Sequence, residues 1–119
     1  MADTPQVKVA LSSDAGANFT SPIRIDDGSP LGRGHLAFDG ADLIVSWIEN
    51  LGEEMAAIRL AKIGSNQQIT KRMTVTKTST ARNSGFPILK KLGNQLLMAW
   101  TVILDEEENT TVKTAVINF

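Results

Sequence analysis

The 119-residue sequence has no cysteine, no tyrosine and a single histidine. Without a thiol the chain forms no disulfide bond, and one histidine without cysteine argues against a zinc site. We therefore expect neither a metal nor a cofactor. Long hydrophobic runs are missing as well, since no stretch approaches the roughly 20 apolar residues that a membrane-spanning helix needs. This pattern argues against a membrane partner.

Positive and negative charges are nearly balanced in number. Lys and Arg number 12 and Asp and Glu 13, which gives a net charge of −1. This balance argues against nucleic acid as a partner, because phosphate contacts need a basic surface. Hydrophobic residues make up 42% of the chain, enough for one compact domain with a modest core. The N-terminal residues are polar and form no secretory signal, so the protein stays in the cytoplasm or its natural N-terminus differs.

Two segments that end in tryptophan repeat each other 53 positions apart. Phe38–Trp47 (FDGADLIVSW) aligns without a gap with Lys91–Trp100 (KLGNQLLMAW). In both, a glycine turn precedes an apolar run, which indicates a hairpin whose second strand is buried on both faces. Two copies of a unit of about 50 residues predict stacked supersecondary elements, with Trp47 and Trp100 in equivalent buried positions.

The segment from Gly52 to Gly64 carries conflicting signals. It contains helix formers throughout, with acidic residues at its start and a lysine near its end, which favours a helix when it is read alone. In the repeat it corresponds to Asn109–Phe119, which is rich in Thr and Val and typical of a strand. Because equivalent positions share their structure, we predict a strand.

The remaining segments extend the repeat, since Gln68–Val75 aligns with Phe19–Ile25. Nine short antiparallel strands in four-stranded units are typical of β-propeller blades. The sequence thus predicts an all-β, propeller-like fold of four-stranded antiparallel blades, with about two blades plus an extra strand in one domain over 1–119. We assign strands three and four of one blade, a full blade and the first three strands of the next to 7–27, 33–76 and 84–119.

The stretch SSDAGANF joins strands three and four of the first unit. The Asp14 carboxylate is placed to accept hydrogen bonds from amides two or three residues further on. Gly16 supplies a positive φ that residues with a side chain resist. We expect Phe19 to fold back under the turn into the core and Ser12 to bond across the hairpin. This pattern favours a structural role for Asp14 over a ligand role.

The spacing resembles the Asp box, or bacterial neuraminidase repeat, whose pattern is Ser/Thr-x-Asp-x-Gly-x-x-Trp/Phe. Ser12, Asp14, Gly16 and Phe19 fill its four positions. The stretches DDGSPLGRGHLAF to LIVSWIE and TARNSGFPILKKLGNQLLMAWT are similar to the C-terminal part of bacterial sialidase-like propellers. The resemblance covers nearly the whole chain and implies a six-bladed propeller, with a little over two blades in this chain. It also implies an exported or periplasmic protein.

The resemblance implies a substrate carboxylate bound by three arginines, a Tyr–Glu pair as nucleophile and an Asp as acid/base. Since the chain has no tyrosine, it cannot carry out this reaction on its own. A carboxylate in place of the tyrosine is conceivable, but no spacing points to a particular pair, and no catalytic residue is assigned.

Arg33 and Arg82 are the candidate ligand-binding residues. Each precedes the first strand of a unit, at the end that faces the central channel in propellers. Planar guanidinium groups suit the carboxylate of an anionic sugar because they offer two parallel hydrogen bonds. The alternative interpretation is that both are surface arginines that bond loop carbonyls.

Three other features have weaker functional interpretations. His35 is a candidate general base, but without an identified partner it is better explained by packing. The acidic run 105–109 has the oxygen ligands that suit calcium, yet it is more typical of a solvated hairpin tip. Glu49 lies at a strand end, an acceptable place for a catalytic carboxylate in a propeller.

Three functions are compatible with these observations. The first is a sialidase-like propeller module, non-catalytic as an isolated chain, that binds carbohydrate or an anionic sugar. The second is a fragment of a glycoside hydrolase whose Tyr, Glu and Asp lie in missing sequence or in another chain. The third is a structural interaction domain. Because the blade edges are open, we also expect self-association, with three copies closing a ring of about six blades.

Overall fold

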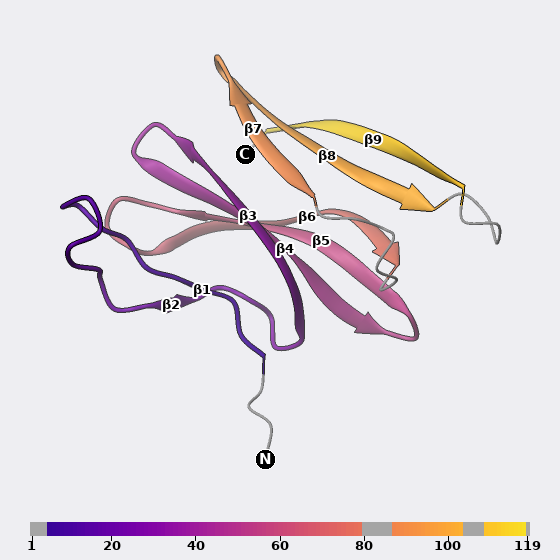
Figure 1. Cartoon of the computed structure of the whole chain (residues 1–119), viewed down its shortest axis with the longest axis horizontal. Helices are drawn as coiled ribbons and strands as arrows, with labels where there is room; N and C mark the ends of the chain where they lie inside the picture. Colours follow the sequence, from indigo (N-terminus) through magenta and orange to yellow (C-terminus); the bar gives the residue numbers. More distant parts are fainter. Residues whose placement is uncertain (1–4, 80–86, 104–108, 119) are drawn as a thin grey trace.

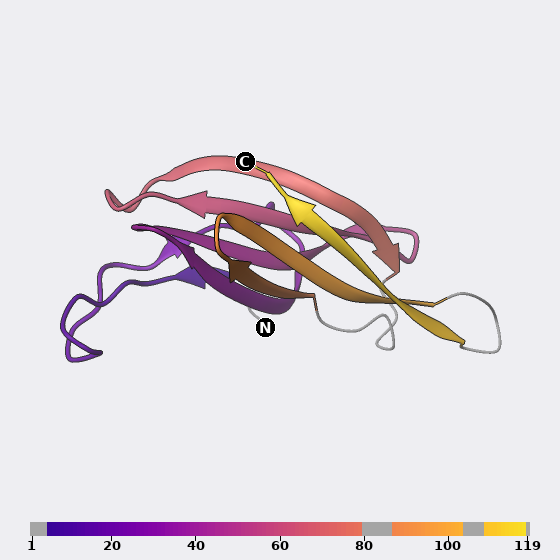
Figure 2. The ribbon, with the colours of Figure 1, turned by 90° about the horizontal axis from the view of Figure 1, so that it is seen from above.

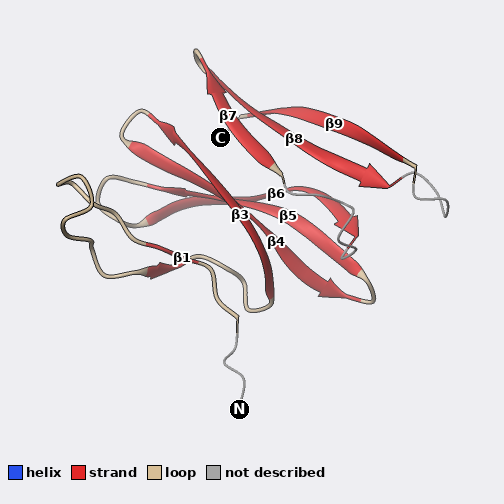
Figure 3. Cartoon of the chain, in the orientation of Figure 1, coloured by secondary structure: helices blue, strands red, loops and turns tan. Residues whose placement is uncertain are grey.

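In the computed structural model, the described residues are 5–79, 87–103 and 109–118. They form β-strands joined by turns and loops, and these ranges contain no helix (Figure 3). Accordingly, nothing in the described part of the chain is a helix long and apolar enough to cross a membrane. The predicted all-β class with antiparallel sheets is confirmed.

The strands form three antiparallel sheets of two, four and three strands, in the order β1–β2, β3–β4–β5–β6 and β7–β8–β9 (Figure 1). Within each sheet, neighbours in sequence are neighbours in space, so the connections are hairpins. The strands are β1 Lys8–Val9, β2 Ile23–Arg24, β3 Pro30–Asp39, β4 Asp42–Gly52, β5 Met55–Ile63, β6 Ile69–Ser79, β7 Ile88–Leu92, β8 Gln95–Ile103 and β9 Thr110–Ile117.

The segment with conflicting signals is a strand, as predicted from the repeat. It forms β5, which pairs on one side with β4 and on the other with β6. Its acidic start forms the turn after β4 instead of a first helical turn, since Glu53 and Glu54 have φ values of +55° and +64°. Hydrogen bonding along both edges and burial of Ile58 and Leu60 outweigh helix propensities of a few tenths of a kcal/mol per residue.

The sequence repeat reappears in the register of the sheets. Leu36 on β3 faces Val45 on β4, and 53 positions later Leu89 on β7 faces Met98 on β8. Trp47 faces Arg59, and Trp100 faces Lys113, so the third strands match with the one-residue insertion that the alignment requires. Both tryptophans are buried, which confirms the prediction of equivalent buried positions.

The four-stranded sheet lies between the other two (Figures 1 and 2). Successive side chains of a strand point to opposite faces, so β4 contributes to two separate cores. The core shared with β1–β2 consists of Val9, Ile25, Leu43, Val45, Trp47, Ala61 and Ile63. The core shared with β7–β9 consists of Ile44, Ile48, Ala56, Ile58, Leu60, Leu89, Leu96, Met98, Trp100 and Ile117. Each tryptophan thus faces the sheet that precedes its own.

Candidate functional site

The loop between β1 and β2 is closed by its own polar side chains. Asp14 Oδ1 accepts hydrogen bonds from the Asn18 backbone amide at 2.9 Å and from the Ser12 hydroxyl at 2.8 Å. Asp14 Oδ2 accepts from the Asn18 side-chain amide at 2.8 Å. These donors, Asn18 first, lower the pKa of Asp14 to about 2. Gly16 has the expected positive φ, +91°, and its amide donates to Ser12 Oγ.

Two expectations about this loop are wrong. Phe19 does not reach the core, because its side chain is 63% exposed. Ser12 does not bond across the hairpin but stays within the loop, where it donates to Asp14 and accepts from Gly16. Thr20 makes the cross-hairpin contact in its place, through its hydroxyl and amide to the backbone of Leu11. The loop therefore holds its shape by local hydrogen bonds and presents an aromatic ring to solvent.

Glu49 is buried, with 3% of its surface exposed, and both oxygens of its carboxylate accept hydrogen bonds. Oε1 accepts hydrogen bonds from the Asp27 amide at 3.0 Å and from the Trp47 indole at 2.8 Å. Oε2 accepts from the Ser29 amide at 2.6 Å. A carboxylate that receives these three N–H groups anchors the chain between β2 and β3. This geometry favours a structural role for Glu49 over a catalytic one.

Asp26 anchors the same connection from the other side. Arg24 binds its carboxylate through Nε and a terminal nitrogen, and the Val7 and Gly28 amides donate to it as well. The hydrogen bonds from Arg24 lower the pKa of Asp26 to about 2, although burial opposes this change. The next residue, Asp27, forms ion pairs with Arg59 and Arg72 of the four-stranded sheet. Asp26 thus fixes the connection to β1 and β2, and Asp27 ties it to the four-stranded sheet.

The candidate ligand residue Arg33 lies within β3 and does not precede the first strand as predicted, because that strand begins at Pro30. The strand is irregular at this residue. The register between β3 and β4 shifts between Pro30 and Gly32 and again between Gly32 and His35. Arg33 has a φ of +57°, in the left-handed region that residues with a side chain rarely adopt. Bulges and strained backbone of this kind concentrate at functional sites. The second candidate, Arg82, and the acidic run 105–108 lie outside the described residues.

Two side-chain contacts join the edge strands β3 and β7. The Leu89 amide donates to His35 Nδ1 at 3.0 Å, which gives this histidine the structural partner that the sequence did not identify. Lys91 Nζ donates to Asp39, and this hydrogen bond lowers the pKa of the Asp39 carboxyl. Lys62 Nζ lies 3.6 Å from the same carboxylate. The edge strands of neighbouring sheets therefore run side by side, with Arg33 on the first of them.

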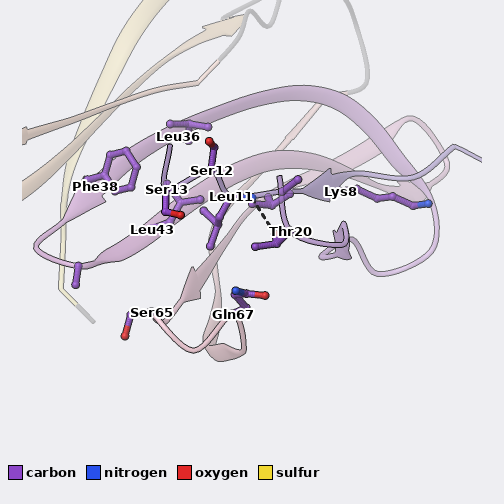
Figure 4. Close-up of a pocket in the computed structure, with 13 residues that line it drawn as sticks. Lys8, Leu11, Ser12, Ser13, Thr20, Leu36, Phe38, Leu43, Ser65 and Gln67 are labelled. Atoms are coloured by element: carbon purple, nitrogen blue, oxygen red, sulfur yellow. Dashed lines mark hydrogen bonds between the residues drawn. The ribbon is translucent and has the colours of Figure 1, made fainter. Parts of the chain in front are cut away.

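A groove runs between β1 and β3 (Figure 4). It consists of two adjoining cavities of about 550 and 410 Å³, both of which are lined by Lys8, Val9 and Leu36. Figure 4 shows Leu36 and Phe38 of β3 on one side of the larger cavity. Ser12 and Ser13 of the β1–β2 loop line it as well.

The repeat explains why this groove exists. Leu89 is 3% exposed because it packs against the four-stranded sheet, whereas its equivalent Leu36 is 53% exposed. Leu36 faces a sheet of only two strands, β1 and β2, which cover β4 and β5 but leave β3 uncovered. The groove therefore occupies the place where two further strands would lie in a four-stranded sheet.

No group of three or more metal-ligating side chains is found among the described residues. Comparison of the chain with protein-family models, with curated proteins and with solved structures finds no match in any of the three.

Proposed function

We propose that this chain is a run of consecutive blades of a sialidase-like β-propeller, which binds carbohydrate and is non-catalytic by itself. The observation that carries this proposal is the recurrence of one pairing register and one packing arrangement 53 residues apart, in adjacent sheets. The loop with the Asp-box spacing joins β1 and β2 and is closed by Asp14, which supports the proposal. Repeated antiparallel sheets packed side by side are the building plan of propellers.

Arg33 is the proposed ligand contact. It belongs to β3, which is an edge strand of its sheet and which in a propeller would line the central channel. Its backbone lies in the left-handed region, and strained backbone of this kind concentrates at functional sites. A guanidinium group at this position suits the carboxylate of an anionic sugar.

Catalysis by the chain alone is not part of the proposal. The chain lacks the tyrosine of sialidases, and the buried Glu49 already accepts three N–H groups. We expect no turnover of a fluorogenic sialoside by the purified chain. Turnover would favour the alternative, a glycoside hydrolase in which another carboxylate serves as nucleophile.

Arg33→Gly tests the ligand contact and relieves the backbone strain, because glycine adopts the positive φ at this position more easily than arginine. The matched control is Glu53→Gly, since Glu53 has a φ of +55° in an exposed turn. Binding of N-acetylneuraminic acid and of a glycan array should fall about tenfold or more in the first variant, the loss expected for one charge-assisted contact. Equal affinity in both variants, or no affinity of the wild type for any glycan, would contradict the proposal.

A further inference from the structure

The groove between β1 and β3 is bordered by an open strand edge. Towards β2, the Val7 carbonyl accepts from the Ile25 amide and the Leu11 carbonyl from the Thr20 amide. Alternate residues of a strand direct their backbone groups to opposite sides, so Lys8 and Ala10 direct theirs away from β2. Both residues line the groove, and no strand of the described ranges pairs with this edge of β1. The groove thus combines unpaired backbone groups with the exposed side chains of Leu36 and Phe38.

The opposite end of the molecule carries an uncovered apolar surface. One face of β7–β9 has a cavity of about 490 Å³ lined mainly by apolar atoms, including those of Ile88, Leu97 and Val116. Ile88 and Val116 are 55% and 49% exposed. In the repeat, Leu97 corresponds to Ile44 of the four-stranded sheet, which is fully buried under β7–β9. This face of β7–β9 is therefore the equivalent of a surface that is covered elsewhere in the same chain.

These two surfaces are the two halves of an interface that the chain already forms once. Inside the molecule, the face of the four-stranded sheet that carries Ile44 packs against Leu89 and its neighbours on β7–β9. The face of β7–β9 that carries Leu97 is equivalent to the face that carries Ile44. The groove surface that carries Leu36 is equivalent to the surface that carries Leu89. They lie at opposite ends of one chain, so they meet only between different molecules.

We infer that the groove receives the β7–β8 hairpin of a second copy of this chain, in a head-to-tail contact. β8 of one copy pairs with the open edge of β1 of the next, as β4 pairs with β5, and Ile88 and Leu97 cover Leu36 and Phe38. Each copy then contributes two complete four-stranded sheets, and a rotation that closes gives a ring. This inference concerns assembly and goes beyond the proposed binding of carbohydrate.

β9 leaves β8 in this arrangement, because β1 of the neighbour takes its position. β9 pairs with β8 along its 8 residues, so the exchange gives up these backbone pairs. Its side chains add little to hold it there, since most are exposed and Ile117 is its one buried residue. β1, by contrast, is anchored through Val9 in the core and through the Val7 amide on Asp26. The exchange of one strand between identical chains is a common route to oligomers.

Two surface variants test the contact, since both residues are exposed in the free chain and tolerate a charge there. Leu36→Asp blocks the groove, and Ile88→Asp blocks the face of β7–β9. Burial of a carboxylate against apolar side chains should weaken association roughly 100-fold or more in either variant. Phe19→Asp, which places the same charge on an exposed residue outside both surfaces, is the control and should associate like the wild type.

Light scattering coupled to size-exclusion chromatography, over a range of concentrations, should give a trimer for the wild type and monomers for each blocked variant. An equimolar mixture of Leu36→Asp and Ile88→Asp should give a dimer of one copy of each, because one intact groove and one intact face remain. Hydrogen exchange should show the Lys8 and Ala10 amides protected on association. The inference would be overturned by a monomeric wild type, by the absence of a dimer in the mixture, or by association without this protection. Glycan binding, measured on the same samples, tests the proposed function separately.

Discussion

Glu49→Gln tests whether the buried carboxylate holds the two-stranded and four-stranded sheets together. Glutamine has almost the same shape, so the substitution changes hydrogen bonding and charge without leaving a cavity. Its oxygen can keep the contacts with the Asp27 amide and the Trp47 indole, at 3.0 and 2.8 Å. Its NH₂ group then stands where Oε2 accepts from the Ser29 amide at 2.6 Å, so one donor faces another.

The expected cost follows from these contacts. A charge-assisted hydrogen bond contributes about 1.5–3 kcal/mol, and a buried amide left without an acceptor costs about 1–3 kcal/mol. The lost hydrogen bond and the unpaired Ser29 amide are partly the same effect, so the two energies do not add in full. We therefore expect the free energy of unfolding to fall by about 2–3 kcal/mol. Urea unfolding followed by tryptophan fluorescence measures it, with Glu53→Gln in the exposed β4–β5 turn as a control within about 0.5 kcal/mol of wild type. A Glu49→Gln variant as stable as the control would refute the anchoring role.

Three further predictions concern stability. Leu89→Ala should cost about 2–4 kcal/mol because it empties a buried site, whereas Leu36→Ala at dilute concentration should cost less than about 0.5 kcal/mol; urea midpoints compare the two. Arg24 lowers the pKa of Asp26 to about 2, so this pair stabilises the fold above about pH 4, and the stabilisation is lost as the pH falls through 2. In Asp26→Asn, the free energy of unfolding should therefore fall by about 1–2 kcal/mol less between pH 4 and pH 2 than in the wild type, since solvent partly screens Arg24. Gly16→Ala should lower the thermal midpoint by a few degrees, since φ is +91° there, and an unchanged midpoint would contradict the strain.

Much of the fold follows from the repeat rather than from local propensity. The alignment of Trp47 with Trp100 predicts equivalent buried positions for the two side chains, and the repeat identifies β5 as a strand against its own helix propensity. Two copies of a pattern constrain each other, so an ambiguous segment takes the structure of its clearer equivalent. Periodicity alone would not have resolved this segment.

The parts that sequence reasoning missed depend on distant contacts. Phe19 fits the Asp-box pattern, but its loop is closed by polar side chains and its ring stays exposed. Two of the hydrogen bonds that the Glu49 carboxylate accepts come from amides about 20 residues earlier in the chain, and no local sequence pattern marks them. The groove also has no signature of its own in the sequence, since Leu36 and Leu89 are identical residues of which one is exposed and the other is buried.

The hydrogen bond from the Leu89 amide to His35 has a consequence for solubility. β3 and β7 are edge strands, and an unpaired amide at a sheet edge is a template for uncontrolled growth by strands of other molecules. The His35 imidazole accepts the hydrogen bond from the amide that such a strand would use, and a side chain offers no backbone edge to a further strand. The edge of β7 is thereby protected at Leu89 from the addition of a foreign strand.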